Sequence, residues 1–157
     1  MTPKQRPEVV QLALPKGRIQ DGVVGLLSEA GITVSNSARG YRPTLSIPGF
    51  ETKMLKPQNI VEMLSCGTRD LGFAGADWVL EKEADLVEII DTGLDPVRLI
   101  AAAPEASLQN PDFLVGPLVV ASEYEVLARR WIESKGIDGT LVRTYGATEV
   151  FPPEDAD

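Results

Sequence analysis

The residues best suited to chemistry form a short basic turn, Lys16-Gly17-Arg18. An apolar segment precedes this turn and an amphipathic segment follows it, so the sequence predicts a strand, a turn and a helix in succession. Such a helix directs its first N–H groups and the positive end of its dipole at whatever lies above the turn. Two cations and a glycine that allows close backbone approach make this a candidate phosphate site. A solvated basic turn is the alternative interpretation.

The composition excludes several kinds of catalysis. The 157 residues include no histidine and a single cysteine, Cys66. This excludes Ser-His-Asp and Cys-His catalysis, histidine-ligated zinc and an internal disulfide. The beginning of the chain has no apolar signal region, and no apolar run approaches the ~20 residues of a membrane span. We therefore expect a cytoplasmic protein without membrane contact, whose chemistry rests on positioning, electrostatics or carboxylates.

The charges are distributed unevenly along the chain. The net charge is −8, yet residues 1–57 contain eight Lys or Arg and four Asp or Glu, which is a net charge of +4. An acidic protein with one basic cleft suits a phosphorylated substrate, especially one that carries Mg²⁺. Nucleic acid is disfavoured as a partner, because its binding surfaces are usually broad basic stripes.

The remaining pattern predicts strands that alternate with helices, which is typical of a mostly parallel α/β sheet. Strands are expected at 9–14, 45–47, 52–55, 70–74, 86–90, 97–103, 114–121 and 140–144. Helices are expected at 19–30, 59–66, 77–82 and 123–134, with a loop at 104–111. Pro57 is expected at the start of the second helix, and Gly31 and Gly136 are expected to end the first and the last. We place a boundary near residue 95, between a first lobe, 1–95, and an incomplete second lobe, 96–157.

A second turn, Gly75-Ala76-Asp77, follows the strand expected at 70–74. Parallel sheets bind ligands outside the carboxyl ends of their strands, and both this turn and Lys16-Gly17-Arg18 lie at such ends. Asp77 therefore has two interpretations: a side chain of a binding cleft, or the N-cap of the helix at 77–82. Trp78 and Trp131 are interpreted as packing residues, because large aromatic side chains mostly lie in cores.

Four motifs together resemble a known family. They are Leu14-Pro-Lys-Gly-Arg-Ile19, Leu55-Lys-Pro-Gln-Asn-Ile60, Asp70-Leu-Gly-Phe-Ala-Gly-Ala-Asp77 and Tyr145-Gly-Ala-Thr-Glu-Val150. Their order and spacing resemble the catalytic subunit of ATP phosphoribosyltransferase, the glycosyltransferase that opens histidine biosynthesis. The resemblance extends over nearly the whole chain and indicates its N-terminal portion.

The resemblance implies a fold and a reaction. The fold is a two-lobed α/β architecture like that of type II periplasmic binding proteins, with the substrates in the cleft. The reaction joins N1 of the adenine of ATP to C1 of phosphoribosyl pyrophosphate and releases pyrophosphate, with Mg²⁺. Displacement at this carbon passes through an oxocarbenium-like state and needs no histidine. Cation clamps that stabilise the departing pyrophosphate supply the main catalytic effect.

The resemblance also implies roles for individual residues. Lys16, Arg18 and Arg42 form the phosphate clamp. The remaining substrate-binding candidates are Gly17, Arg39, Lys56, Gly75, Asp77 and Glu149. Lys56 stands where the family often has arginine, so the charge is kept and the bidentate fork is lost. Arg39 has a surface ion pair as its alternative role, and Glu149 has helix capping.

This chain departs from the family pattern at its end. It stops before a Thr-Gly-x-Thr-type loop that holds the 5-phosphate of phosphoribosyl pyrophosphate, so we expect residues 1–157 alone to be inactive and the second lobe to be incomplete. The expected partners are ATP, phosphoribosyl pyrophosphate, and further subunits, either identical or regulatory. A non-catalytic module that binds a small anion on the same scaffold is the rival hypothesis, because a fold alone does not determine function.

Overall fold

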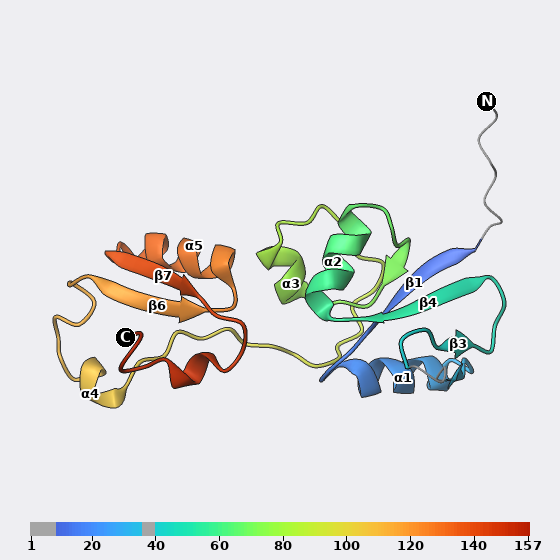
Figure 1. Ribbon diagram of the computed structural model, residues 1–157, viewed down its shortest axis with the longest axis horizontal. Coiled ribbons are helices and arrows are strands. Elements are labelled where there is room, and N and C mark those ends of the chain that lie inside the picture. The colour runs from blue at the N-terminus through green and yellow to red at the C-terminus, as the bar shows by residue number, and fades with distance from the viewer. Residues whose placement is uncertain (1–8, 36–39) are drawn as a thin grey trace, which may run out of the picture. The chain divides into compact units, whose positions relative to one another are not determined.

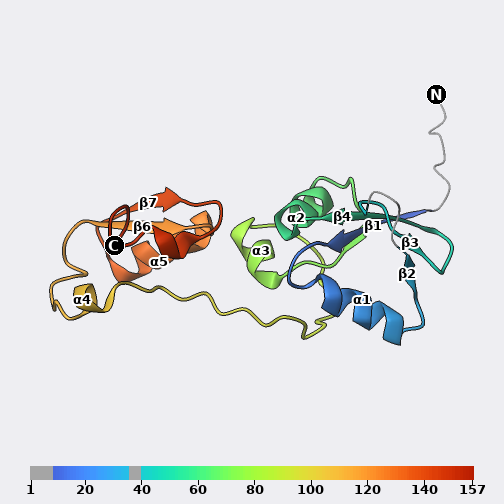
Figure 2. The same ribbon diagram turned by 60° about the horizontal axis from the view of Figure 1, so that its bottom comes forward.

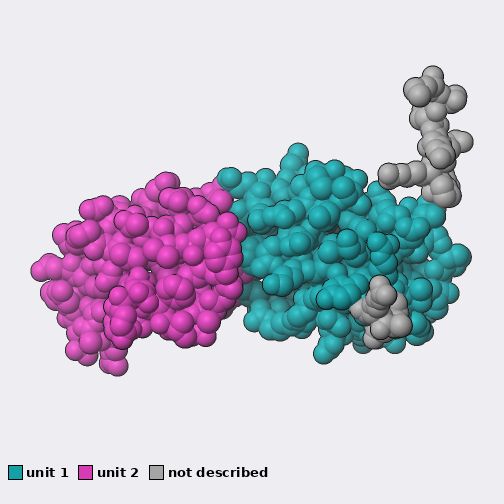
Figure 3. All heavy atoms as spheres, viewed as in Figure 1, with its two compact units in different colours: residues 1–97 teal, residues 98–157 magenta. Residues whose placement is uncertain are grey.

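The computed structural model describes residues 9–35 and 40–157. The chain divides into two compact units, Met1–Val97 and Arg98–Asp157, called unit 1 and unit 2 below (Figure 3). No helix in the described ranges is both long enough and apolar enough to cross a membrane.

Unit 1 contains a parallel sheet with helices on both faces. The sheet has the strand order β4-β1-β5, and every pairing in it is parallel. Helix α1 covers one face and α2 covers the other (Figures 1 and 2). The elements are β1 (Val10–Pro15), α1 (Gln20–Glu29), β2 (Val34–Ser35), β3 (Thr44–Leu45), β4 (Phe50–Leu55), α2 (Pro57–Ser65), β5 (Leu71–Gly72) and α3 (Ala76–Glu81). The predicted parallel α/β class is thereby confirmed for this unit.

The central strand β1 is buried because both of its faces are covered. Leu12 and Leu14 pack with Val23 of α1 and with Met54 of the neighbouring strand β4. Ala13, which points to the opposite face, is completely buried. An apolar run without alternation is the pattern expected of a parallel strand between two layers of helices, and residues 12–15 have that pattern.

Glycine and proline residues mark the ends of the helices. Helix α1 is followed by Gly31, whose φ of +78° and N–H bond to the Ser28 carbonyl end the helix. Helix α2 begins at Pro57, where the missing proline N–H costs nothing. In unit 2, Gly136 ends α5 in the left-handed conformation, with a φ of 64°. The predicted Gly31 and Gly136 stops and the Pro57 start are confirmed.

Unit 2 is built on a single β-α-β motif. Strands β6 (Leu118–Ser122) and β7 (Gly139–Arg143) pair in parallel and are joined by α5 (Glu125–Lys135). Leu118, Ile132 and Ile137 form its core. The segment predicted to be a loop at 104–111 contains a short helix, α4 (Glu105–Leu108), so that prediction was incomplete. A 3-10 helix, Thr148–Val150, follows β7.

Two predicted strands, 86–90 and 97–103, were wrong. Both segments are irregular, although their sequences are as apolar as those of the real strands. Their side chains are exposed, with Val87 at 90%, Ile89 at 76% and Ile100 at 70% of their full accessible surface. A strand requires a neighbour for its N–H and C=O groups, and no strand among the described residues pairs with either segment. Local pattern therefore overstated the regular structure here.

The close packing of α2 on the sheet gives a prediction for Gly72. A Cβ at this residue would lie 2.8 Å from Cγ2 of Ile60 and 3.3 Å from Cβ of Ala13, in a part of the core without spare volume. We expect Gly72→Ala to lower the free energy of unfolding by about 1–3 kcal/mol, the usual cost of overpacking. Urea denaturation monitored by circular dichroism measures the change.

Gly25 provides the matched control for that substitution. It lies within α1, and a Cβ there would have nothing within 4 Å. Gly25→Ala is expected to raise the free energy of unfolding by roughly 0.5–1 kcal/mol, because alanine favours a helix over glycine. Equal effects of the two substitutions would contradict the packing described for α2.

Candidate functional site

The candidate site is organised by the register between β1 and β4. The last register pair is Pro15 with Leu55, and the next N–H, that of Lys16, donates a 2.8 Å hydrogen bond to the Leu55 carbonyl. Lys16 and Lys56 therefore follow paired residues of adjacent parallel strands. This brings two cations from distant parts of the sequence together at the carboxyl edge of the sheet, where α/β proteins bind ligands.

The basic turn adopts the predicted strand–turn–helix geometry. Gly17 has a φ of +87°, and a Cβ there would meet no atom within 4 Å, so the glycine is required by conformation and leaves the turn open. The Gln20 N–H donates to the Gly17 carbonyl at 3.0 Å, and α1 begins at Gln20. The backbone thus reverses directly over the carboxyl end of β1, with Lys16 and Arg18 on either side of the glycine.

Lys16 is oriented by an aromatic ring that the sequence did not reveal. Its Nζ lies 3.4 Å from the centre of the Tyr41 ring. A cation over a ring face is held by the ring quadrupole, and the ring does not cancel the charge. The ammonium of Lys16 is therefore directed and still cationic. The adjacency of Tyr41 to the candidate Arg42 was the one available signal, and sequence spacing could not place it beside Lys16.

The segment that carries Tyr41 and Arg42 is tied to β4 at two points. The Met54 N–H donates a 2.9 Å bond to the Tyr41 carbonyl, and the buried Thr52 hydroxyl donates to the Pro43 carbonyl. Arg42 lies between these two anchors and is exposed. Its backbone is thus fixed beside β4, the strand that Lys56 follows. Arg39, the remaining cation predicted for this region, lies outside the described residues.

Arg18 is paired with a carboxylate that the sequence analysis missed. Its Nε donates to Oδ2 of Asp95 at 2.8 Å, and the two side chains are 73% and 29% exposed. Asp95 lies 77 residues away in sequence, so no local motif could have predicted the contact. The charge of Arg18 is balanced by the Asp95 carboxylate, whereas Tyr41 orients the Lys16 ammonium without balancing its charge.

The second predicted turn differs from expectation at Asp77. Gly75 is the N-cap of α3, and Asp77 lies in the first turn of that helix, so the N-cap interpretation of Asp77 was wrong. Any side chain at residue 75 would collide with the Asp77 carboxylate, which folds back over the glycine. An acidic group here is stabilised by the helix dipole. A role for Asp77 in binding remains a prediction.

Unit 2 carries the last candidate, Glu149, beyond the carboxyl end of β7. Glu149 is exposed and lies within the 3-10 helix, whose N-cap is Ala147, so capping does not explain this residue. The hydroxyls of Thr144 and Thr148 are 2.7 Å apart, so they join the end of β7 to the start of the 3-10 helix. Ala147 has a φ of 49°, an uncommon conformation for a residue with a Cβ.

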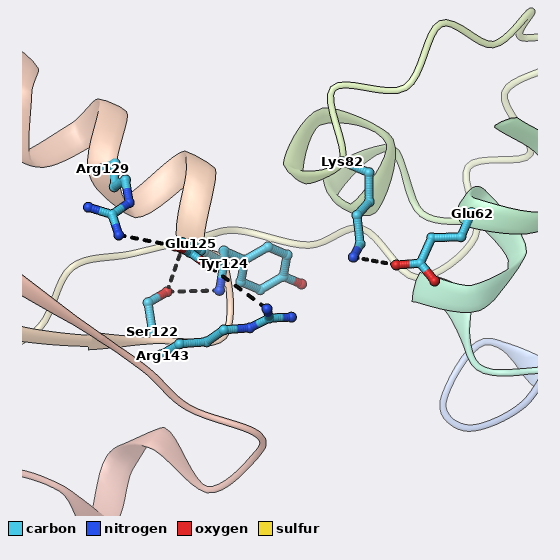
Figure 4. Close-up of polar contacts among 7 residues, drawn as sticks. All are labelled: Glu62, Lys82, Ser122, Tyr124, Glu125, Arg129 and Arg143. Carbon is cyan, nitrogen blue, oxygen red and sulfur yellow. Dashed lines mark hydrogen bonds and ion pairs between the residues drawn. The ribbon is translucent and has the colours of Figure 1, made fainter.

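An ion-pair cluster that the sequence analysis also missed lies at the same end of unit 2. Glu125 accepts from Nη2 of Arg129 at 3.1 Å and lies 3.8 Å from Nη1 of Arg143, as Figure 4 shows. The guanidinium of Arg143 also lies 5.1 Å from the centre of the Tyr145 ring. In unit 1 a comparable contact, 2.6 Å from Lys82 Nζ to Glu62 Oε1, joins α3 to α2 (Figure 4). These contacts fix the beginning of α5 and the position of α3.

The described residues offer limited titratable chemistry. A hydrogen bond with the Thr68 hydroxyl, 3.4 Å from Sγ, lowers the pKa of the exposed Cys66 thiol. Cys66 caps the end of α2 opposite to Lys56, so it takes no part in the cation cluster that Lys16 and Lys56 form at the sheet edge. No group of three or more His, Cys, Asp or Glu side chains that could hold a metal ion is found within 9–35 and 40–157.

Comparison with known proteins places the chain in a family. The family model described as ATP phosphoribosyltransferase matches residues 56–157. The ATP phosphoribosyltransferase of Chlorobaculum parvum is 34% identical over 155 residues, which cover 95% of this chain and 52% of that protein. That of Thermodesulfovibrio yellowstonii is 32% identical over 158 residues and covers 97% of this chain and 54% of that protein. The chain spans about half the length of these relatives.

A solved structure supports the fold assignment. The ATP phosphoribosyl transferase (HisG:HisZ) complex from Thermotoga maritima includes a chain with a TM-score of 0.66 and 23% identity. The similarity covers 92% of this chain and 69% of that one. At this identity the likeness concerns the fold. The family model, which matches well over half of the residues, decides the assignment: the chain belongs to the ATP phosphoribosyltransferase family.

Proposed function

We propose that this chain supplies the phosphate-binding part of an ATP phosphoribosyltransferase, the enzyme of the first step of histidine biosynthesis. The observation that carries the proposal is the meeting of Lys16 and Lys56 at one sheet edge in a member of this family. The open Gly17 turn and the anchored Arg42 segment add a backbone approach and a third cation. The rival, a non-catalytic anion-binding module, is less well supported because the relatives are named as enzymes.

The chemistry suits these residues. The N1 lone pair of adenine forms a bond to C1 of the ribosyl group, while the bond from C1 to the pyrophosphate oxygen breaks and its electron pair leaves with pyrophosphate. Negative charge therefore grows on the leaving group. Lys16, Arg18 and Arg42 stabilise that charge as fixed cations, which lowers the barrier more than it stabilises the bound substrates.

The other candidates take supporting roles. Lys56 holds a phosphate beside Lys16, and Gly17 lets its backbone approach the ligands. Gly75 contributes by leaving room for the Asp77 carboxylate. Asp77 lines the substrate-binding site, and Glu149 helps to hold the ribosyl substrate. Mg²⁺ arrives with the substrate phosphates, which is its usual mode of binding. Its chemical contribution is to neutralise the polyphosphate charge.

The proposed enzyme has the two-lobed architecture of type II periplasmic binding proteins and acts in the cytoplasm. It works with further subunits, either identical or of a second kind, and the HisG:HisZ complex from Thermotoga maritima supports this proposal.

The proposed function is tested with this chain and with a chimera. In the chimera, residues 1–157 replace the aligned half of the Chlorobaculum parvum relative, which provides the length that the chain does not span. We expect the chimera to form phosphoribosyl-ATP with Mg²⁺ in an absorbance assay, and the chain alone to bind ATP and pyrophosphate by calorimetry. A chain that binds neither ligand, or a folded chimera that binds both without turnover, would contradict the proposed function.

Removal of a clamp cation gives the next prediction. Arg18→Ala or Arg42→Ala in the chimera should reduce kcat/KM by roughly 10- to 150-fold, because each substitution removes a charge-assisted contact of about 1.5–3 kcal/mol. Both side chains are exposed, so the thermal midpoint should change little. Arg129→Ala in unit 2, which removes an exposed ion pair with Glu125, is the control for the loss of one positive charge. Wild-type rates in both clamp variants would refute their assigned role.

Lys56 gives a separate prediction about phosphate recognition. Lys56→Arg should bind phosphoribosyl pyrophosphate as well as wild type or better, because it restores a planar fork without changing the charge. In calorimetric titrations, Lys56→Glu should lower the affinity for phosphoribosyl pyrophosphate more than the affinity for ATP. Lys135→Glu, the same reversal on an exposed residue of unit 2, is the control. Equal losses of affinity for both ligands in the Lys56→Glu variant would show that Lys56 acts only through the overall electrostatic field of the protein.

A further inference from the structure

The segment that delivers Asp95 to Arg18 is anchored on unit 1. Leu94 packs against the cluster of Leu12, Leu14, Val23 and Met54, and its Cδ2 lies 3.3 Å from the position of a Cβ on Gly22. Just before it, the Gly93 N–H donates to the Asp91 carboxylate at 2.9 Å in a turn with a φ of +63°. The core contact of Leu94 and the turn at Gly93 together fix the position of residue 95. Asp95 is therefore presented to the basic turn by the fold.

The backbone of Asp95 adopts a conformation that its sequence disfavours. Its φ is +48°, although it carries a Cβ and precedes Pro96. Residues before proline prefer extended backbone, and left-handed backbone is uncommon for any residue other than glycine. Such a conformation persists where the surroundings hold it, and its presence is a reason to look for a function. The visible contact of the Asp95 side chain is the ion pair with Arg18.

The two cations of the turn are treated differently. Lys16 lies over the neutral Tyr41 ring and keeps its charge for a ligand, whereas Arg18 faces a carboxylate at 2.8 Å. A carboxylate on a guanidinium has the charge and the oxygen geometry of a bound anion. Asp95 thus stands in for part of a phosphate ligand at one of the two cations.

We propose that Asp95 is a resident counter-ion of the anion site, which sets the affinity of the site because a phosphate ligand must displace it from Arg18. The inference rests on the proposed function only in taking the Lys16-Gly17-Arg18 turn as the place where phosphate binds. An incoming anion first meets Lys16, which forms no ion pair with a carboxylate within residues 9–35 and 40–157, and then exchanges with the Asp95 carboxylate at Arg18. Removal of that carboxylate strengthens binding, whereas a carboxylate that merely positioned Arg18 would weaken binding when removed.

Inorganic pyrophosphate is the probe, measured by calorimetry on the 157-residue chain. Asp95→Asn should bind pyrophosphate roughly two- to fivefold more tightly at low salt, the change expected when an exposed ion pair no longer competes. The difference should shrink in about 0.5 M salt, because exposed charges are then screened. Asp95→Gly, which suits the left-handed backbone, should behave in the same way and covers the case in which the asparagine variant does not fold.

The control is Glu51→Gln, which removes the same charge elsewhere on unit 1. Glu51 accepts a 2.9 Å hydrogen bond from Gln11 and lies four residues from the end of β4, about 13 Å along the strand from the site. The gain of this variant in affinity for pyrophosphate should be much smaller than that of Asp95→Asn, because its charge lies farther from the site. A gain as large as that of Asp95→Asn would show that net charge alone is responsible, and would overturn the proposal.

A double-mutant cycle tests the assignment to Arg18. In the Arg18→Gln background, adding Asp95→Asn should leave the affinity unchanged, because the cation that Asp95 occupies is gone. Wild-type or weaker affinity in Asp95→Asn, persistence of its gain without Arg18, or no binding of pyrophosphate by any variant would overturn the proposal. Pyrophosphate binding is read without turnover, so the inference stands if the cycle behaves as expected even where the phosphoribosyl-ATP assay fails.

Discussion

The parallel pairing of β1 with β4 is the interaction on which the rest of unit 1 depends. Six consecutive register pairs, Val10↔Phe50 to Pro15↔Leu55, bring together two stretches that are forty residues apart. The pairing buries β1 between two layers of helices, and it also brings Lys16 beside Lys56. Stability and the cation cluster therefore have one origin. Non-local parallel pairing has a high entropic cost, and burial of the apolar core around Leu12 and Leu14 offsets that cost.

The sequence predicted the parts of the fold in which the apolar pattern agrees with the glycine and proline residues at the ends of the elements. The β1–turn–α1 unit and the Gly31 stop follow from an apolar run, a basic turn and an amphipathic run with a glycine after it. Pattern failed at 86–90 and 97–103, because apolar character predicts a strand only if a partner strand is available. Pairing is a property of the whole fold, and a local window contains no information about it.

The sequence indicated the cations of the candidate site. It did not indicate the side chains that orient these cations or balance their charge. Lys16 and Arg18 stand out by residue type and by their place after a predicted strand, and Arg42 is indicated by the family resemblance. Tyr41 and Asp95 do not, since each acts on a cation that the backbone brings close from another segment. Side chains that direct or balance a charge carry no signature of their own. They can be recognised only where distances are available, and they decide how much of a formal charge a ligand encounters.

The shared register of β1 and β4 also limits how proteins of this kind can change in length. A residue inserted into either strand would shift one lysine by one position and turn it to the opposite face of the sheet, because side chains alternate along a strand. The same insertion between β3 and β4, at the Pro48-Gly49 turn, leaves both strand ends where they are. Length variation among related sequences should therefore collect in the connections, with the two strands kept at equal length from Val10 and Phe50 onward. An alignment of relatives can use that equality as a fixed reference.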